Sequence, residues 1–272
     1  MRDAQRAVKA IAVGFAILLV YGIIVSVLGA GMIVGQIFGV EQGAAEEWSE
    51  TVISDKGDFA ELCVNVGSVN VRMERGEEFQ VWADNEVVEF RRDTDKVYIE
   101  EKDFDWLSRR EKWGGEVKII LPEDLELERV NLEAGAGTVL VNDLKVKELD
   151  MNLGVGRAEL NGVEVTQKTK VDGGAGLLVI RDAEFEKLDL DMGVGKVEIE
   201  VEISGKSKID AGLGKLELNL KGGREDYKMK FSKGLGVITL DGENMNDGAV
   251  WGDGENEIEI DGGVGAIEIH MI

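Results

Sequence analysis

Three residue types are nearly missing from this sequence, which has one proline, one cysteine and one histidine among its 272 residues. The lone Cys63 excludes an intrachain disulfide framework and a cysteine-rich metal site. His270 has no second histidine with which to form a His-based zinc site. Basic residues are also few, because 31 Lys and Arg stand against 54 Asp and Glu and give a net charge of −23. This balance argues against nucleic acid as a partner, since phosphate binding needs clustered basic side chains.

A long uncharged run lies near the N-terminus. No charged residue occurs from Ala10 to Val40, and a helix of that length at ~1.5 Å per residue exceeds the ~30 Å hydrocarbon core of a bilayer. Cations precede the run and acids follow it: Arg2, Arg6 and Lys9, then Glu41, Glu46 and Glu47. By the positive-inside rule we expect a cytoplasmic N-terminus at 1–9, a transmembrane helix at 10–40, a linker at 41–57 and an extracytoplasmic domain at 58–272. The chain is thus expected to be a single-pass cell-membrane protein; a cleaved signal peptide is the alternative.

Three glycines, Gly31, Gly35 and Gly39, recur every four residues inside this run. On a helix they share one face and allow a second helix to approach closely. The spacing predicts helix packing and a homo-oligomer formed through the transmembrane helix. The alternative is that glycine is simply frequent in membrane helices.

The phrase Gly-x-Gly recurs seven times in the second half of the chain, and the first glycines are 19, 20, 19, 19, 22 and 29 residues apart. A dinucleotide fingerprint would instead be a single G-x-G-x-x-G between a strand and a helix. Repetition at a short, fixed period is typical of a solenoid. We therefore predict structural corners at Gly135, Gly137, Gly154, Gly156, Gly174, Gly176, Gly193, Gly195, Gly212, Gly214, Gly234, Gly236, Gly263 and Gly265.

Apolar residues alternate with polar ones on both sides of each glycine pair. Around the fourth copy the apolar series runs through Met192 and Val194 and resumes at Val197, so the spacing slips from two to three. Such a slip would turn the second strand's apolar face outward unless the chain turned a corner there, and glycine accepts the φ > 0 that a corner can require. The prediction places the middle residue of Gly-x-Gly, such as Val194, on the inward face.

An earlier copy, "LCVNVGSVNVRM", follows the same rule across Gly67 and Ser68. We therefore predict an all-β chain: a single-stranded parallel β-helix of about eight ~19-residue coils, stacked ~4.8 Å apart and preceded by one transmembrane helix. An irregular insert at 74–128 separates the early copy from the regular coils.

The stretch "VKIILPEDLELERVNLEAGAGTVLVNDL" and the coils after it resemble the putative-adhesin domain family of unknown function, which includes the "toast-rack" envelope proteins. The resemblance covers roughly Asp58 to Ile272. It implies a single β-solenoid with an envelope-associated or surface-exposed role, and it carries no catalytic residues to transfer.

The residue two positions before each first glycine is mostly acidic. Stacked coils would align these side chains ~5 Å apart, where like charges repel and favour a counter-cation. No copy carries the aspartate that a calcium-binding nonapeptide needs after its second glycine. We expect a solvated acidic stripe without a cofactor, and Ca²⁺ binding is the alternative. The residues are Glu133, Asn152, Asp172, Asp191, Asp210, Ser232 and Asp261.

Two insertions are candidate interaction sites. The first, "DFDWLSRREKWGG" at 103–115, mixes aromatic and basic residues that could contact lipid headgroups or a partner; the alternative is a loop that plugs one end of the core. The second, at 242–257, holds a tryptophan among acids, which if exposed could stack on a sugar. The named candidates are Phe104, Trp106, Arg109, Arg110, Trp113 and Trp251.

Taken together, these patterns predict a membrane-anchored, extracytoplasmic β-solenoid that acts as a structural, adhesive or regulatory interaction module without catalysis. Its expected partners are the membrane, an envelope protein or a surface polysaccharide. The alternative is a carbohydrate-active or carbohydrate-binding β-helix protein, whose enzymatic form would need acids and a base that converge in one groove.

Overall fold

The computed structural model describes residues 50–55, 59–84, 88–102 and 115–272. Over these ranges the regular elements are β-strands, so the predicted all-β fold is confirmed. No helix within them is long and apolar enough to cross a membrane. The predicted segments 1–9 and 10–40, with Gly31, Gly35 and Gly39, and most of the linker 41–57 lie outside these ranges.

The strands form one sheet. They are β1 (Glu50–Asp55), β2 (Glu61–Val66), β3 (Asn70–Gly76), β4 (Phe79–Asp84), β5 (Val88–Asp93), β6 (Lys96–Glu101), β7 (Glu116–Pro122), β8 (Leu127–Asn142), β9 (Lys145–Asn161), β10 (Glu164–Asp172), β11 (Ala175–Glu186), β12 (Leu188–Ser204), β13 (Lys206–Leu220), β14 (Tyr227–Ser232), β15 (Val237–Leu240), β16 (Glu243–Asn244), β17 (Val250–Trp251) and β18 (Asn256–Met271).

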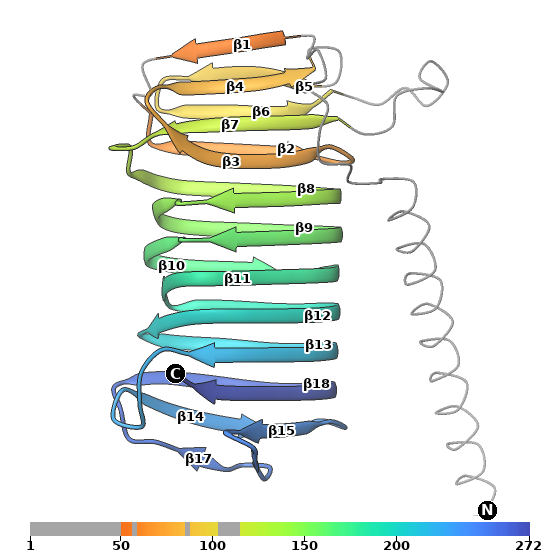
Figure 1. The fold of residues 1–272 in the computed structure, drawn as a ribbon, viewed down its shortest axis with the longest axis vertical. Helices are drawn as coiled ribbons and strands as arrows, with labels where there is room; N and C mark the ends of the chain where they lie inside the picture. Colours follow the sequence, from red (N-terminus) through yellow and green to blue (C-terminus); the bar gives the residue numbers. More distant parts are fainter. Residues whose placement is uncertain (1–49, 56–58, 85–87, 103–114) are drawn as a thin grey trace, which may run out of the picture. The chain divides into compact units, whose positions relative to one another are not determined.

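Each regular coil is one turn of chain that pairs in parallel with its neighbours. Leu190 of β12 lies beside Ile209 of β13, and Val197 lies beside Leu216, so equivalent positions are 19 residues apart. The long strands β8, β9, β12, β13 and β18 bend in the middle, and their bends lie one above another at the right of Figure 1. The regular spacing of the sequence repeats is therefore the spacing of these layers.

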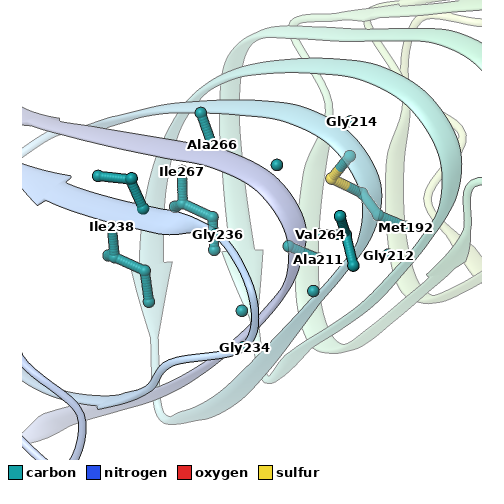
Figure 2. Close-up of a pocket in the computed structure, with 14 residues that line it drawn as sticks. Met192, Ala211, Gly212, Gly214, Gly234, Gly236, Ile238, Val264, Ala266 and Ile267 are labelled. Carbon is teal, nitrogen blue, oxygen red and sulfur yellow. The ribbon is translucent and has the colours of Figure 1, made fainter. Parts of the chain in front are cut away.

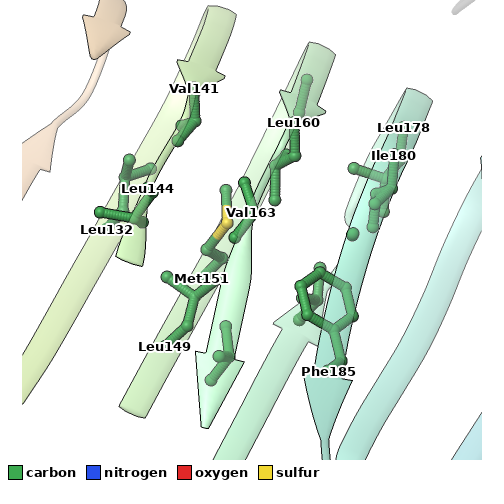
Figure 3. Close-up of a cluster of buried hydrophobic side chains, with 14 of the residues drawn as sticks. Leu132, Val141, Leu144, Leu149, Met151, Leu160, Val163, Leu178, Ile180 and Phe185 are labelled. Carbon is green, nitrogen blue, oxygen red and sulfur yellow. The ribbon is translucent and has the colours of Figure 1, made fainter. Parts of the chain in front are cut away.

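Side chains at alternate positions fill the interior of the coils. On β12, Leu190 and Met192 are buried while Asp191 between them is exposed. Figure 3 shows how Met151 and Phe185, from neighbouring coils, lie within one cluster of buried hydrophobic side chains. One coil alone offers too few apolar side chains to form a core, so each layer depends on the layers beside it.

The stack does not follow the order of the chain, which the sequence analysis does not predict. The coil of β2 and β3 lies between β6–β7 and β8, because Leu62 pairs with Val97 on one side and with Val130 on the other. At the other end β18 lies between β13 and β14–β15, because Ile260 is the neighbour of both Ile209 and Phe231. In both places a coil is inserted between two others that are closer to each other in sequence.

Charge alternation across the layers explains this order at the β18 end. The Glu257 carboxylate lies between two ammonium groups, 3.2 Å from Lys206 Nζ and 3.9 Å from Lys228 Nζ. If β14 stacked directly on β13, Lys206 and Lys228 would be neighbours, and like charges directly opposite each other destabilise a sheet. The adjacent column obeys the same rule, with the order Asp189, Lys208, Glu259, Lys230.

The other inserted coil shows the same alternation. Lys96 of β6, Glu61 of β2, Arg129 of β8 and Glu148 of β9 are successive neighbours. Ion pairs of 2.6 Å join Lys96 to Glu61 and Arg129 to Glu148. Without β2 in between, Lys96 would lie beside Arg129. Opposite charges in these columns thus favour the observed order at both ends.

We expect Glu257→Lys to lower the thermal midpoint by about 2–4 °C, because it places a third cation between Lys206 and Lys228. The loss should shrink in high salt, since these side chains are exposed and salt screens their repulsion. Thermal unfolding followed by circular dichroism at low and high salt measures both effects. Glu202→Lys is the control, because it places a cation beside Glu184 and should not destabilise. Equal midpoints for the two variants would contradict the role of charge in the order of layers.

Antiparallel strands cover both ends of the parallel stack. On the β2 side, β4 pairs with β1 and β7, and β5 pairs with β6. On the β18 side, β16 pairs with β15, and β17 pairs with β14. The Glu101 carboxylate adds to the first cover by accepting hydrogen bonds from the N–H (2.8 Å) and hydroxyl (3.1 Å) of Ser68. These covers occupy strand edges that would otherwise pair with other chains.

Candidate interaction surface

The glycine pairs lie at the bends of the coils, where the backbones of successive layers approach closely. Gly195 has a φ of 145°, which side chains of L-residues rarely allow. A Cβ at Gly195 would also lie 2.0 Å from the carbonyl oxygen of Gly176 in the layer before it. Gly193 lacks the positive φ, but a Cβ there would lie 1.9 Å from the oxygen of Gly174. Glycine is therefore required at this bend both by conformation and by the stacking.

The other predicted corner glycines show variations of this pattern. A positive φ also occurs at Gly137, Gly156, Gly174, Gly176, Gly214 and Gly265. A Cβ would lie within 2.5 Å of a backbone oxygen of a neighbouring layer at Gly135, Gly154, Gly156, Gly174, Gly176, Gly212, Gly214, Gly234, Gly236, Gly263 and Gly265.

The middle residue of Gly-x-Gly is exposed or half-buried and lies outside the buried core, so the prediction that Val194 and its equivalents face inward is wrong. The exposed fractions are 55% for Val155, 47% for Val264 and 88% for Leu235. Bends at two glycines in succession rotate the chain, so that the residue between them lies at the apex rather than on either inner face. The alternation of a straight strand therefore does not extend through the corner.

These apex residues form a continuous row that we call the apolar edge. Val194 pairs with Ala175 on one side and with Leu213 on the other, and the register continues through the other layers. Figure 2 shows Val264 of the edge beside the corner glycines Gly212 and Gly214. In stacking order the edge consists of Ala136, Val155, Ala175, Val194, Leu213, Val264 and Leu235.

Carboxylates line one side of the apolar edge, in the row predicted to form the acidic stripe. Asp172, Asp191, Asp210 and Asp261 are successive neighbours. Lysine side chains hold several of them: Lys208 Nζ lies 2.6 Å from Asp210 and 3.5 Å from Asp261. The hydrogen bond to Asp210 is the main reason why the pKa of Lys208 is raised. Among the described residues no group of three or more His, Cys, Asp or Glu could hold a metal ion.

Cationic side chains line the other side of the apolar edge. Lys215 Nζ lies 2.8 Å from Glu268, and this hydrogen bond raises the pKa of Lys215 and lowers that of Glu268. Lys196 pairs in the same way with Glu198, whose pKa it lowers. Lys196 and Lys215 are neighbours directly beside the edge, and Leu177 separates them from Arg157 in a layer nearer the N-terminus. The two sides of the edge thus differ in charge.

Two cavities next to the apolar edge are small. One lies beneath Val264, between the bends of β13, β18 and the chain before β15 (Figure 2), and has a volume of about 10 Å³. The other lies beneath Val155 and has a volume of about 20 Å³. Each has room for about one water molecule, and ligand pockets are typically several hundred Å³. These cavities are therefore too small for a typical ligand, and the edge can interact with a partner by surface contact.

Trp251, a candidate for stacking on a sugar if exposed, is half-buried against the core. It pairs with Met229 in β14, and the Arg224 guanidinium lies 5.7 Å from its ring centroid. The ring thus helps to close the β18 end of the stack. The basic-aromatic candidates Phe104, Trp106, Arg109, Arg110 and Trp113 lie outside the described residues.

A further set of turns was missed by the sequence analysis. Asp143, Gly162 and Asp182 have φ values of 54°, 63° and 51° and turn the chain a second time in their coils. The signal was present as the dipeptides Asn-Asp, Asn-Gly and Arg-Asp at 142–143, 161–162 and 181–182. Asp and Asn tolerate this conformation better than other non-glycine residues. The glycine pair is thus one of several turns in each coil.

The comparisons with known proteins support a family assignment. The Toastrack DUF4097 model matches residues 39–270, and no curated protein matches the chain. Among solved structures, a putative cell adhesion protein from Clostridium sporogenes has 16% identity, covers 82% of this chain and 99% of its own, and gives a TM-score of 0.38. For a putative adhesin from Parabacteroides distasonis the values are 14%, 82%, 96% and 0.37. The structural likenesses are too weak to carry an argument, but the family model spans most of the sequence, and the chain therefore belongs to the Toastrack DUF4097 family.

Proposed function

We propose that the protein is an extracytoplasmic interaction module of the cell envelope, anchored by residues 10–40 and without catalytic activity. The observation that carries this proposal is the apolar edge, a row of aliphatic side chains of which Val155, Val264 and Leu235 are exposed. Exposed apolar rows of this kind mark sites of protein or membrane contact. The uncharged N-terminal run with preceding cations supports the anchor.

The arrangement of the acids supports a non-catalytic role. General acid–base chemistry needs side chains that converge on one reacting atom. Here the carboxylates of the stripe repeat in most layers, at most one to a layer, and lysines form ion pairs with several of them. A regular row of carboxylates of this kind keeps a surface soluble and influences which partners bind to it. The carbohydrate alternative is less favoured, because Trp251 packs against the core.

The location can be tested with a membrane-impermeant maleimide on intact cells. In a Cys63→Ser background, Glu184→Cys provides an exposed thiol on a face away from the apolar edge. We expect this thiol to react on intact cells, and mass spectrometry should find residues 10–40 retained in the mature protein. Labelling only after lysis would contradict the extracytoplasmic location, and a mature N-terminus near residue 40 would contradict the anchor. Cys63→Ser without the added thiol is the control.

A further inference from the structure

The apolar edge runs over seven layers, and its residues are exposed towards both ends and half-buried at Ala175, Val194 and Leu213. Successive layers of a β-sheet are ~4.8 Å apart, so the row from Ala136 to Leu235 is about 29 Å long. Single exposed aliphatic residues are common on protein surfaces and need no explanation. A row at equivalent positions is different, because four of its seven members are exposed: Ala136, Val155, Val264 and Leu235. We therefore expect a partner molecule of similar length to cover the apolar edge.

At two neighbouring levels the two sides of the edge carry opposite charges. At the level of Val194, Asp191 lies three residues before the edge and Lys196 lies two residues after it. At the level of Leu213 the corresponding residues are Asp210 and Lys215. Both pairs are in register across β12 and β13. A partner that fits this edge therefore needs a basic side opposite the aspartates and an acidic side opposite the lysines.

A second copy of the same chain meets this requirement. We propose that two copies associate through their apolar edges, face to face, around a two-fold axis parallel to the stack. This rotation exchanges the two sides, so that Asp191 of one copy faces the partner's Lys196, and Asp210 faces the partner's Lys215. A two-fold axis across the stack would instead place aspartate opposite aspartate. Charge thus selects the arrangement in which both stacks run in the same direction.

The pairing is weak, because the edge is one side chain wide. Stable interfaces bury about 800 Å² on each partner, and narrower contacts belong to the transient class. Two chains anchored in one membrane, as proposed above, are confined to one surface. Anchoring would therefore raise the effective concentration of the copies and favour the pair.

Disulfide trapping tests the arrangement with the full-length chain in native membranes. In the Cys63→Ser background, Val155→Cys alone and Val264→Cys alone should each form disulfide-linked dimers under mild oxidation. Under the proposed two-fold axis each edge residue meets its own copy, and disulfides need Cα atoms within about 7 Å. Glu184→Cys, on another face, is the control and should not crosslink.

A mixed experiment separates the two directions. Val155 and Val264 lie at equivalent distances from the two ends of the edge, so an antiparallel pair would link Val155→Cys to Val264→Cys. If that mixed dimer forms while neither variant links to itself, the proposed axis is wrong. If neither variant links to itself and no mixed dimer forms, the edge does not bind a second copy and the proposal is also wrong.

Charge reversal tests the pairing of the two sides. Asp191→Lys with Asp210→Lys, and separately Lys196→Asp with Lys215→Asp, should each reduce crosslinking through Val264→Cys about tenfold. A mixture of the two reversed chains should restore it, because each reversed side then faces its complement. Recovery in the mixture also shows that both variants are folded. Crosslinking unchanged by either reversal, or no recovery on mixing, would overturn the proposal.

Discussion

Gly195→Ala is expected to lower the free energy of unfolding by about 3–5 kcal/mol, because it combines backbone strain with a clash between layers. The φ of 145° is one that alanine rarely adopts, and its Cβ would lie 2.0 Å from the Gly176 oxygen. That oxygen belongs to a stacked backbone that cannot move without disturbing the next layer. Denaturant unfolding at a fixed temperature measures the loss.

Two other alanine substitutions separate the causes. Gly242 has a φ of 82° and no atom within 4 Å of an added Cβ, so Gly242→Ala measures conformational strain alone, at about 1–2 kcal/mol. Gly193 is outside the strained region, but its Cβ would meet the Gly174 oxygen at 1.9 Å, so Gly193→Ala measures the clash. If Gly195→Ala costs no more than Gly242→Ala, close stacking at the bend is not the reason for glycine.

Arg75→Ala is expected to cost about 2–4 kcal/mol, mainly in the covered end formed by β3 and β7. Its Nε donates to the Asp143 oxygen at 2.6 Å, and its Nη1 donates to the oxygens of Pro122 and Leu125 at 2.6 and 2.8 Å. Burial lowers the pKa of this guanidinium, but the group stays charged. Hydrogen bonds from a charged donor contribute about 1.5–3 kcal/mol each, and partial exposure reduces their sum.

Arg75→Lys distinguishes the shape of the group from its charge. A single ammonium cannot reach three carbonyls in different directions, so lysine should recover less than half of the loss. Hydrogen exchange of the β7 amides should accelerate in both variants, while β12 remains protected. Arg181→Ala, at an exposed position, is the control and should change stability by less than about 0.5 kcal/mol. Unchanged protection of β7 would show that Arg75 does not clamp this end.

The coil period and the core could be predicted from the sequence, because both depend on local pattern. The 19-residue spacing of the glycine pairs matches the register of Leu190 with Ile209, and alternation correctly identified Met192 as buried. The direction of Val194 could not be predicted in this way. Alternation holds only while the strand is straight, and the bend at Gly193 and Gly195 rotates the chain by an amount that the pattern does not encode.

The order of the layers could not be predicted from periodicity, because the repeats all have the same spacing and the same apolar pattern. The information lies in charges far apart in the chain, such as Lys206, Lys228 and Glu257. These charges become informative only when the charge pairs in alternative stacking orders are compared. The surface was missed for a related reason: the exposure of Val155 and Leu235 follows from the geometry of the bend, and aliphatic residues at repeat positions are normally assigned to the core.

The inserted position of β18 makes the timing of synthesis matter. β14 and β15 leave the ribosome before β18, at a moment when β13 still has a free edge. Lys206 and Lys208 then face Lys228 and Lys230, so the early strands are repelled from the place that β18 will take. Once β18 arrives, Glu257 forms ion pairs with Lys206 and Lys228 on its two sides, and Glu259 forms one with Lys230. A stop codon before residue 256 would accordingly remove an inner layer and leave β14–β17 facing a surface of its own charge.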